Sequence, residues 1–282
     1  MNISLPAETI FYLGQLAISN SILTGWVVTL VLVIGAFFLR RSLRRIPGRF
    51  QSLIEALYAY FYSTAENIIG NPAVAREIFP FIITAFFFIL LSNWSGLIPG
   101  FTTIGFHEVH EGKDILVPLL RAPTSDLNTT VALSAFAIIY IQYLGLKHAG
   151  PLVYIGRFLN FKSPIGFFIG IVELISEVSR IISFSFRLFG NVFAGEVLIT
   201  VIFYLTMTLV PYIPILPLPF FALELAVGAV QAFIFCFLTL MFTSMAVVSH
   251  DSHGHQVGGE ELHLTGGSET EAKEGNAILQ TS

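Results

Sequence analysis

Long apolar runs constrain the fold of this chain more than any other feature. Residues 21–39, 79–98 and 128–146 contain no charged side chain, and two longer, mainly apolar stretches cover residues 165–210 and 220–248. A helix needs about 20 residues to cross the hydrocarbon layer of a membrane. The sequence therefore predicts an all-α integral membrane protein, with three ordinary transmembrane helices, one amphipathic surface helix and a long tilted C-terminal helical hairpin.

The overall composition excludes two other classes of protein. Of the 282 residues, 55% are apolar and 11% are charged, whereas a soluble domain has roughly 25% charged residues. Such a hydrophobic chain is not intrinsically disordered over most of its length, and its apolar surface is too large to bury inside a soluble globule of this size. The single cysteine, Cys236, supports no disulfide framework and no thiolate metal cluster. We expect no cofactor and no metal site.

The distribution of basic residues predicts the orientation in the membrane. Five arginines follow the first apolar run directly: Arg40, Arg41, Arg44, Arg45 and Arg49. Basic loops remain on the cytoplasmic side of a membrane, so the N-terminus is expected outside. Alternation of the spans then places the C-terminus in the cytoplasm of a multi-pass cell-membrane protein. The residues before Arg40 lack the positively charged start of a secretory signal.

The segment after the arginines has a different pattern. Residues 49–70 carry apolar side chains at three- and four-residue steps, which predicts an amphipathic helix on the cytoplasmic surface. A helix packed against a partner subunit is the alternative. We expect Asn71-Pro72 to end this helix.

These patterns divide the chain into six segments. They are an outer N-terminal segment (1–20), the first transmembrane helix with its basic cytoplasmic end (21–48), the amphipathic helix (49–72), a two-span hairpin with an outer loop (73–164), the long helical hairpin (165–248) and a polar, acidic, histidine-containing cytoplasmic tail (249–282). The tail is expected to be disordered. A straight helix over residues 165–210 would be about 69 Å long, so this segment must tilt steeply, break, or both.

A stripe of polar residues marks one face of this long segment. At about 100° per residue, Glu173, Glu177, Arg180, Arg187 and Asn191 fall within roughly 80° of one another. An arginine at mid-bilayer costs about 2.5–3.5 kcal/mol on insertion scales, so the stripe must face a partner, a cavity or water. Glu177 and Arg180 are spaced to neutralise each other. Arg187 has no acid three or four residues away, and its guanidinium cannot lose a proton, so its counter-ion must come from elsewhere.

The last apolar helix supplies a second polar set. Glu224 and Gln231 are seven residues apart and share a face. They could meet the stripe, or they could pair with each other or with hydroxyl groups across the hairpin. Glu196 points away from the stripe unless the first helix is broken near Gly190 or Gly195.

Four motifs carry a resemblance to a known family. The run RLFGNVFAGE at 187–196 and QAFIF at 231–235 resemble the signature of subunit a of the F-type ATP synthase membrane sector. NWSGLIP at 93–99 and PTSDLN at 123–128 resemble two further stretches of that family. The resemblance extends over about residues 20–248. It implies a stator with two aqueous half-channels, which carry ions to and from the carboxylates of a rotating ring of c subunits.

The resemblance also implies roles for single residues. Arg187 would face the ring carboxylate, force release of its ion and block leakage. The residues implied along or near the outer half-channel are Asp126, Asn191, Glu196, Glu224 and Gln231, and Glu173 is implied at the cytoplasmic half-channel. We add Glu177 and Arg180 of the same stripe to the candidate ion path. Some bacterial relatives carry His at the position of Glu224, so which of Glu196 and Glu224 relays the ion stays open, as does the choice between proton and sodium.

The implied partners are the c-subunit ring, the peripheral-stalk b subunits, other ATP synthase subunits and the lipid bilayer. Neither nucleic acid nor direct nucleotide binding is expected, and the chain is not expected to be an enzyme on its own. A secondary transporter would normally show duplicated halves, and none is visible. An ion channel would need a filter sequence such as TVGYG, which is absent. An intramembrane enzyme is disfavoured because HExxH, GxSxG and GxxxxGK are absent.

Overall fold

Long helices make up most of the fold. The computed structural model describes residues 9–13, 16–98, 105–110, 113–118, 120–150, 154, 156, 158, 164–209 and 216–248. The long helices within these residues are α1 (Asn20–Ser42), α2 (Arg49–Ile69), α3 (Pro72–Ser95), α4 (Leu127–Ala149), α6 (Pro164–Leu209) and α7 (Leu218–Val248). All of them except α2 are long and apolar enough to cross a membrane. The chain is therefore an all-α, multi-pass membrane protein, as predicted.

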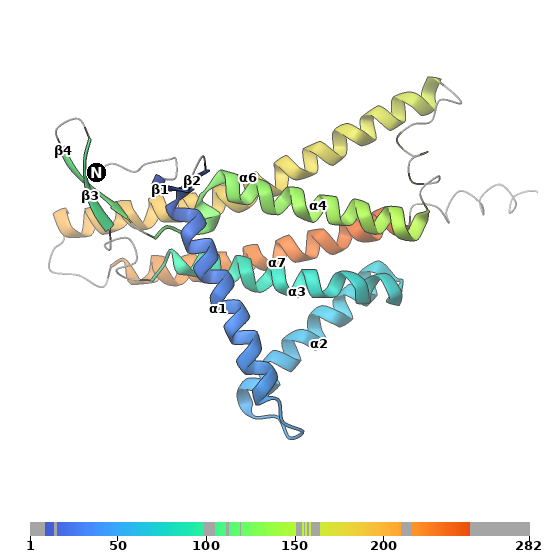
Figure 1. Cartoon of the computed structure of the whole chain (residues 1–282), viewed down its shortest axis with the longest axis horizontal. Coiled ribbons are helices and arrows are strands. Elements are labelled where there is room, and N and C mark those ends of the chain that lie inside the picture. The colour runs from blue at the N-terminus through green and yellow to red at the C-terminus, as the bar shows by residue number, and fades with distance from the viewer. Residues whose placement is uncertain are drawn as a thin grey trace, which may run out of the picture.

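Four of the helices run alongside one another. Figure 1 shows α3, α4, α6 and α7 running lengthwise in the same general direction, and α7 contacts each of the other three. In the same view α1 runs across the direction of this group, and α2 returns from the far end of α1 to the start of α3. We call these four helices the bundle.

The boundary between α2 and α3 depends on two adjacent residues. Gly70 adopts a left-handed conformation with φ +70°, and its N–H donates to the carbonyl of Glu66, which ends α2. Asn71 then caps α3, because its side-chain oxygen accepts hydrogen bonds from two backbone N–H groups of the first turn. Pro72 fits the first turn of α3, where its missing N–H has no helical partner to lose. Gly70 thus ends α2, and Asn71-Pro72 begins the next helix.

The long segment forms one continuous helix. α6 has 46 residues, and no break occurs at Gly190 or Gly195. Figure 1 shows that its two halves run in somewhat different directions, so the helix is curved. The structure therefore excludes a break as the way to fit this length into a membrane, and the steep tilt stays a prediction.

Buried apolar side chains from every helix of the bundle form one cluster. Ile82 and Ile89 of α3, Leu144 of α4, Leu188 of α6 and Leu240 of α7 are all fully buried in one cluster. A cluster of three charged or titratable side chains links the start of α3 to the end of α4. The Lys147 Nζ lies 2.6 Å from Glu77 Oε1, and the His148 Nε2 lies 3.0 Å from Glu77 Oε2.

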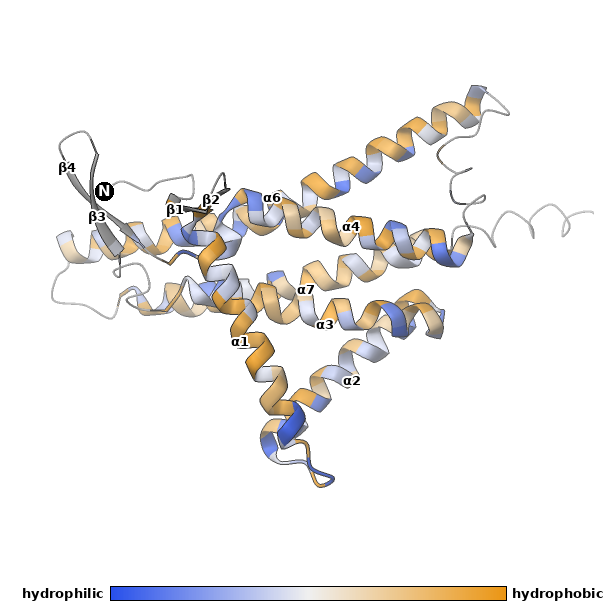
Figure 2. Ribbon diagram, viewed as in Figure 1, coloured by the Kyte–Doolittle hydropathy of each residue, from blue (hydrophilic) through white to orange (hydrophobic). Residues whose placement is uncertain are grey.

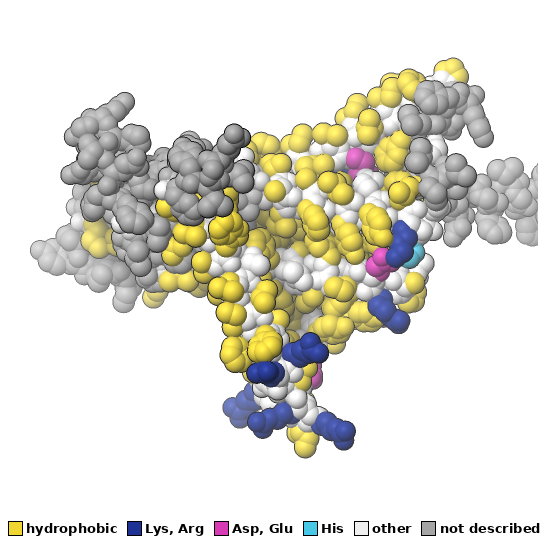
Figure 3. All heavy atoms as spheres, in the orientation of Figure 1, with side chains coloured by type: hydrophobic (Ala, Val, Ile, Leu, Met, Phe, Trp, Pro, Cys, Tyr) yellow, Lys and Arg dark blue, Asp and Glu magenta, His cyan; other side chains and the backbone are white. Residues whose placement is uncertain are grey.

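The outside of the molecule is largely apolar. Figure 2 shows hydrophobic residues along the helices, α1 included, and Figure 3 shows Lys and Arg side chains gathered where α1 passes into α2. On α1, Trp26, Leu30 and Phe38 are each more than half exposed. Exposed apolar helices with a cationic end are typical of a protein surrounded by lipid.

Two β-hairpins were not predicted. β1 (Thr9–Leu13) pairs with β2 (Leu16–Ser19), and β3 (Gly105–His110) pairs with β4 (Lys113–Pro118), both in antiparallel fashion. A short 3-10 helix, η1 (Pro123–Ser125), precedes α4. The sequence analysis treated these stretches as a plain N-terminal segment and a plain loop, because strands of this length carry little periodic signal. The tail, 249–282, lies outside the described residues.

Candidate functional site

The first two charged residues of the stripe with this spacing, Glu177 and Arg180, form an ion pair within α6, while Glu177 Oε2 is buried and accepts no hydrogen bond among the described residues. Arg180 Nη1 lies 2.5 Å from Glu177 Oε1, and the Arg180 guanidinium lies 4.6 Å from the centre of the Phe242 ring on α7. Glu177 is buried, with 8% of its surface exposed. The two charges therefore neutralise each other, as their three-residue spacing allows. Glu173 lies one turn earlier on α6 and is half-buried.

An open hollow extends along α6 next to this pair. It has a volume of about 290 Å³, and its polar lining comes from Ser176, Ser179, Arg180, Ser183 and Arg187. Its apolar lining comes from aromatic and leucine side chains of α6 and α7. The hydroxyl and guanidinium groups in this lining can hydrogen-bond to water, which lipid tails cannot do. The hollow extends along α6 from Arg180 to Arg187, and its lining is partly polar and partly apolar.

Arg187 is exposed and lies beside the hollow. Its Nη2 donates to the hydroxyl of Ser183 at 3.4 Å. Among the described residues, no Asp or Glu forms an ion pair with it. A guanidinium keeps its positive charge under all physiological conditions. Within the described part of the chain, Arg187 therefore has the unpaired charge that the sequence analysis expected.

The helix that carries Arg187 is lightly covered by the rest of the chain. In its most apolar window, α6 is 17% buried, compared with 44% for α3 and 39% for both α4 and α7. Ile182 and Phe186, on either side of Arg187's turn, are both more than half exposed. An apolar helix with so little cover needs lipid or another protein against it.

Beyond Arg187, the polar side chains of α6 contact other elements. The Asn191 side-chain amide donates to Gln231 Oε1 of α7 at 2.6 Å. Gln231 is buried, with 2% of its surface exposed. The structure thus brings together two residues from separate motifs. Gln231 contacts the stripe, and the alternative of a Glu224–Gln231 pair does not occur in the structure.

Glu224 of α7 lies directly against the backbone of α6. A Cβ atom added at Gly195 would lie 2.0 Å from the Glu224 carboxyl carbon, so only glycine allows this contact. Glu224 is half-buried, and its carboxyl has no ion pair or hydrogen bond among the described residues. With any residue other than glycine at position 195, the Glu224 carboxyl would have to move from its present place.

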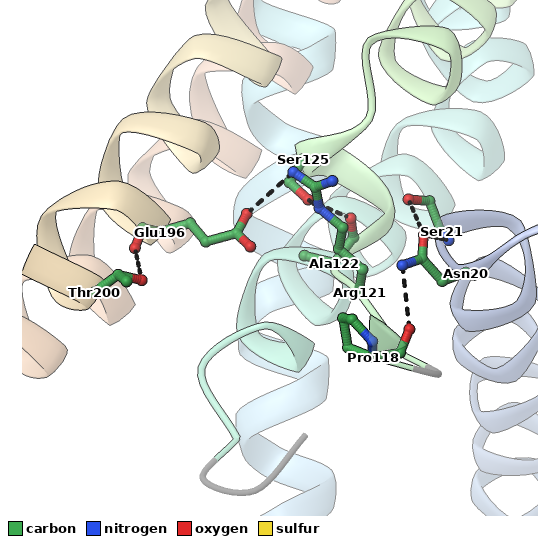
Figure 4. A network of polar contacts seen from close by, with 8 residues as sticks. All are labelled: Asn20, Ser21, Pro118, Arg121, Ala122, Ser125, Glu196 and Thr200. Carbon is green, nitrogen blue, oxygen red and sulfur yellow. Dashed lines mark hydrogen bonds and ion pairs between the residues drawn. The ribbon is translucent and has the colours of Figure 1, made fainter. Parts of the chain in front are cut away.

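Glu196 points in another direction, toward the segment that contains η1. Its Oε2 lies 3.7 Å from Nη2 of Arg121, as Figure 4 shows. The side chain of Arg121 is 7% exposed and that of Glu196 is 35% exposed. Sequence reasoning did not identify Arg121. The available signal was a basic residue in a loop expected outside the membrane, where basic residues are less common.

Asp126 and residues of the NWSGLIP and PTSDLN motifs form hydrogen bonds that hold neighbouring elements together. The Asp126 side chain is buried and caps α4 by accepting the N–H of Asn128 at 3.0 Å. Thr124 donates to the side-chain oxygen of Asn93 at 2.7 Å, and the Asn93 amide donates to the carbonyl of Gly228 at 3.0 Å. These contacts join η1, α3 and α7 beside Glu224 and Glu196.

Comparison with known proteins identifies the family. The model of the ATP synthase A chain family matches residues 22–244. ATP synthase subunit a of Gloeobacter violaceus is 36% identical over 243 residues, which cover 86% of this chain and 89% of the relative. The protein of the same name from Moorella thermoacetica is 32% identical over 250 residues, with 89% and 98% covered, and that from Campylobacter hominis is 34% identical over 213 residues, with 76% and 82% covered. Because the family model matches most of the chain and these relatives are at least 30% identical over most of its length, the chain belongs to the ATP synthase A chain family.

Proposed function

We propose that this chain is the stator subunit a of a rotary F-type ATP synthase and forms two aqueous half-channels that carry protons to and from the carboxylates of a rotating c-ring. The observation that carries this proposal is Arg187. It is a permanent charge on a lightly covered apolar helix, with no acidic partner among the described residues. Its counter-ion is then a carboxylate of another chain, and a membrane-embedded ring carboxylate fits that requirement.

The mechanism depends on the charge of Arg187. A ring carboxylate surrounded by lipid is stable only when it is neutral. Beside Arg187 its ionised form is favoured, so it releases its proton there and passes the stator as an ion pair. The fixed positive charge also repels a cation that would leak directly between the half-channels. The membrane potential supplies about 2.3 kcal/mol per charge per 100 mV.

The two half-channels lie on either side of Arg187 in this proposal. The hollow with its serine hydroxyls, together with Glu173, Glu177 and Arg180, forms the cytoplasmic one. The outer one is formed beside η1 by five residues, which are Asp126, Asn191, Glu196, Glu224 and Gln231. The support is geometric, because the contacts of Asn191 with Gln231 and of Gly195 with Glu224 bring α6 and α7 together on that side.

The orientation in the membrane follows from α1. If α1 crosses the bilayer with Arg40 and Arg41 in the cytoplasm, the N-terminus lies outside and the C-terminus inside. Because α1 runs across the bundle in Figure 1, α6 then lies obliquely in the membrane. An oblique path accommodates a helix of about 69 Å in a hydrocarbon layer of about 30 Å. α2 then lies along the cytoplasmic surface.

In the assembled complex, other subunits and lipid cover the exposed apolar faces of this chain. The uncovered face of α6 packs against the c-ring, and the exposed apolar side of α1 faces lipid or the peripheral-stalk b subunits. Nucleotide chemistry belongs to other subunits, so the chain is not an enzyme on its own.

Disulfide cross-linking in the assembled complex tests the proposal. The chain's own Cys236 is buried, so it is first replaced by Ala. A cysteine at Ser183, on the Arg187 face, is expected to cross-link to a cysteine placed next to the ring carboxylate. Val178→Cys is the control, because its side chain is 53% exposed but lies on the opposite side of α6. If Val178→Cys cross-links as well as Ser183→Cys, Arg187 does not face the ring.

A further inference from the structure

The turn between α1 and α2 carries a large positive charge that nothing nearby balances. Five of the chain's ten arginines lie within residues 40–49, and residues 40–54 contain no Asp or Glu. Every residue from 40 to 50 is exposed, and none of the five arginines forms an ion pair with another described residue. Figure 3 shows Lys and Arg side chains gathered there, away from the bundle. The charge of the turn is therefore accessible to a partner outside the chain.

Hydrogen bonds from one side chain of α2 fix the shape of this turn. The Gln51 amide donates to the carbonyl of Arg44 at 3.0 Å, and Gln51 Oε1 accepts the backbone N–H of Arg44 at 3.1 Å. The nearest acid, Glu55, accepts a hydrogen bond from the same amide at 2.7 Å. Because Gln51 holds both backbone groups of Arg44, the arginines before and after the turn stay close together.

The arginines of the turn differ in how free they are. Arg40 and Arg41 lie in the last turn of α1, where the partial negative charge of the helix end offsets part of their charge. The Arg41 guanidinium also lies 4.5 Å from the centre of the Phe37 ring. The three arginines beyond α1 have neither of these interactions, and they are Arg44, Arg45 and Arg49.

Bulky apolar side chains are exposed between these arginines. Ile46 is 87% exposed, Phe50 is 72% exposed and Leu53 is 66% exposed. At the end of a helix that crosses a membrane, such a mixture of side chains lies where the acyl chains meet the headgroups. A free anion in water would leave the apolar side chains uncovered, whereas a phospholipid offers an acyl chain to them and a phosphate to the arginines.

The choice of basic residue also favours a phosphate group. All the basic residues within 40–54 are arginines. The planar guanidinium donates two parallel hydrogen bonds to phosphate oxygens, whereas lysine acts as a point charge. Clusters of roughly four to eight basic residues directly after a transmembrane helix attract anionic lipids. The turn thus has both the charge and the donor geometry for a lipid phosphate.

We propose that the turn between α1 and α2 is a binding site for an anionic phospholipid, whose phosphate is held by Arg44, Arg45 and Arg49 and whose acyl chains cover Phe50 and Leu53. This inference goes beyond the proposed function and is independent of it, because it requires only that α1 crosses the membrane. The bound lipid balances the charge of the turn and anchors this corner of the molecule to the membrane surface.

Quenching of a fluorophore by labelled lipids tests the proposal. In the complete complex, Cys236 is replaced by Ala and a fluorophore is attached at Ile46→Cys. The complex is placed in phosphatidylcholine liposomes with a small fraction of nitroxide-labelled lipid, which is either anionic phosphatidylglycerol or zwitterionic phosphatidylcholine with the same acyl label. We expect phosphatidylglycerol to quench about threefold more strongly at equal concentration. Replacing Arg44, Arg45 and Arg49 together by Gln should remove this difference.

Two controls separate a phosphate site from general attraction. Replacing the same three arginines by Lys keeps the charge but not the paired hydrogen bonds, so most of the preference should be lost. If the lysine variant keeps the full preference, charge alone gathers the lipid and the site does not exist. A fluorophore at Val33→Cys of α1, where the side chain is 62% exposed, should show no preference. An equal preference at both positions would mean that anionic lipid accumulates around the whole chain.

Two further outcomes would overturn the proposal. Equal quenching by the two lipids at position 46 of the parent would show that the turn does not select an anionic headgroup. Quenching by neither lipid would mean that a protein segment covers the turn. None of these measurements involves proton transport, so the lipid site and the proposed function can fail separately.

Discussion

The polar side chains in the two halves of α6, before and after Arg187, have different kinds of partner. Before Arg187, Glu177 and Arg180 pair within the helix, and the serine hydroxyls line an open hollow. After Arg187, Asn191 contacts α7 and Glu196 contacts the segment before η1. One half therefore keeps its polar groups local, and the other half places them at contacts between elements.

This difference follows from packing. Where α6 packs on its neighbours, a polar group needs a partner from another element, because water is excluded. Before Arg187, the acid and the base come from the same helix, so this ion pair needs no residue of another element. Arg187 lies at the boundary and has neither an acidic partner of its own chain nor full burial. The comparison indicates that two separate polar surfaces meet at one arginine, and four substitutions test it.

The largest effect is expected at the boundary itself. Arg187→Ala removes the charge that forces proton release and blocks leakage, so coupled ATP synthesis should be abolished, a loss of more than about 4 kcal/mol or a thousandfold. Synthesis driven by an imposed proton gradient in liposomes measures it. The variant should also leak protons passively. Retained synthesis would show that the two polar surfaces do not meet at Arg187.

The second-largest effect on proton transport is expected in the half of α6 after Arg187, which packs on α7. Gly195→Ala places a methyl group where the Glu224 carboxyl lies, so that side chain must move. We expect proton transport to fall roughly tenfold, about 1.4 kcal/mol. Gly190→Ala is the comparison variant, because an added Cβ there has no described atom within 4 Å apart from its own helical neighbours. An equal loss in both variants would assign the effect to a partner subunit and not to Glu224.

A smaller effect, on the stability of the complex, is expected from breaking the Glu177–Arg180 ion pair. Glu177→Gln leaves Arg180 without its acid, and the neutral amide replaces a charged hydrogen bond, so unfolding should become easier by about 1–3 kcal/mol. Thermal unfolding of the complex in detergent measures this change. Adding Arg180→Gln should recover part of the loss. If the single variant is as stable as the parent, the pair contributes nothing to the packing of α6 on Phe242.

The smallest effect is expected in the hollow. Ser183→Ala removes one hydroxyl, whose hydrogen bond to Arg187 is long at 3.4 Å. We expect transport to change less than about twofold, since one weak hydrogen bond contributes about 0.5 kcal/mol or less. Initial rates of proton uptake by liposomes are sensitive enough to measure this. A large loss of transport would mean that Ser183 positions Arg187. The half of α6 before Arg187 would then depend on this one hydrogen bond.

The helices and the stripe could be predicted from the sequence because both are local properties. Helix length follows from unbroken apolar runs, and the spacing of Glu177 and Arg180 places them on one face whatever surrounds them. The β-hairpins and the division of roles between Gly70 and Asn71 escaped prediction, since short strands and helix ends have weak signals.

The partners of the polar groups depended on the three-dimensional fold. Nothing in the order of residues places Arg121 beside Glu196, or the carboxyl of Glu224 on Gly195, because these residues are distant in the chain and meet only when η1, α6 and α7 pack. Periodicity shows which side of a helix a residue occupies, but not which element covers that side. The identity of the membrane helices and the unpaired charge of Arg187 were thus present in the sequence, whereas the contrast between the two acids of α6 and α7 arose from packing.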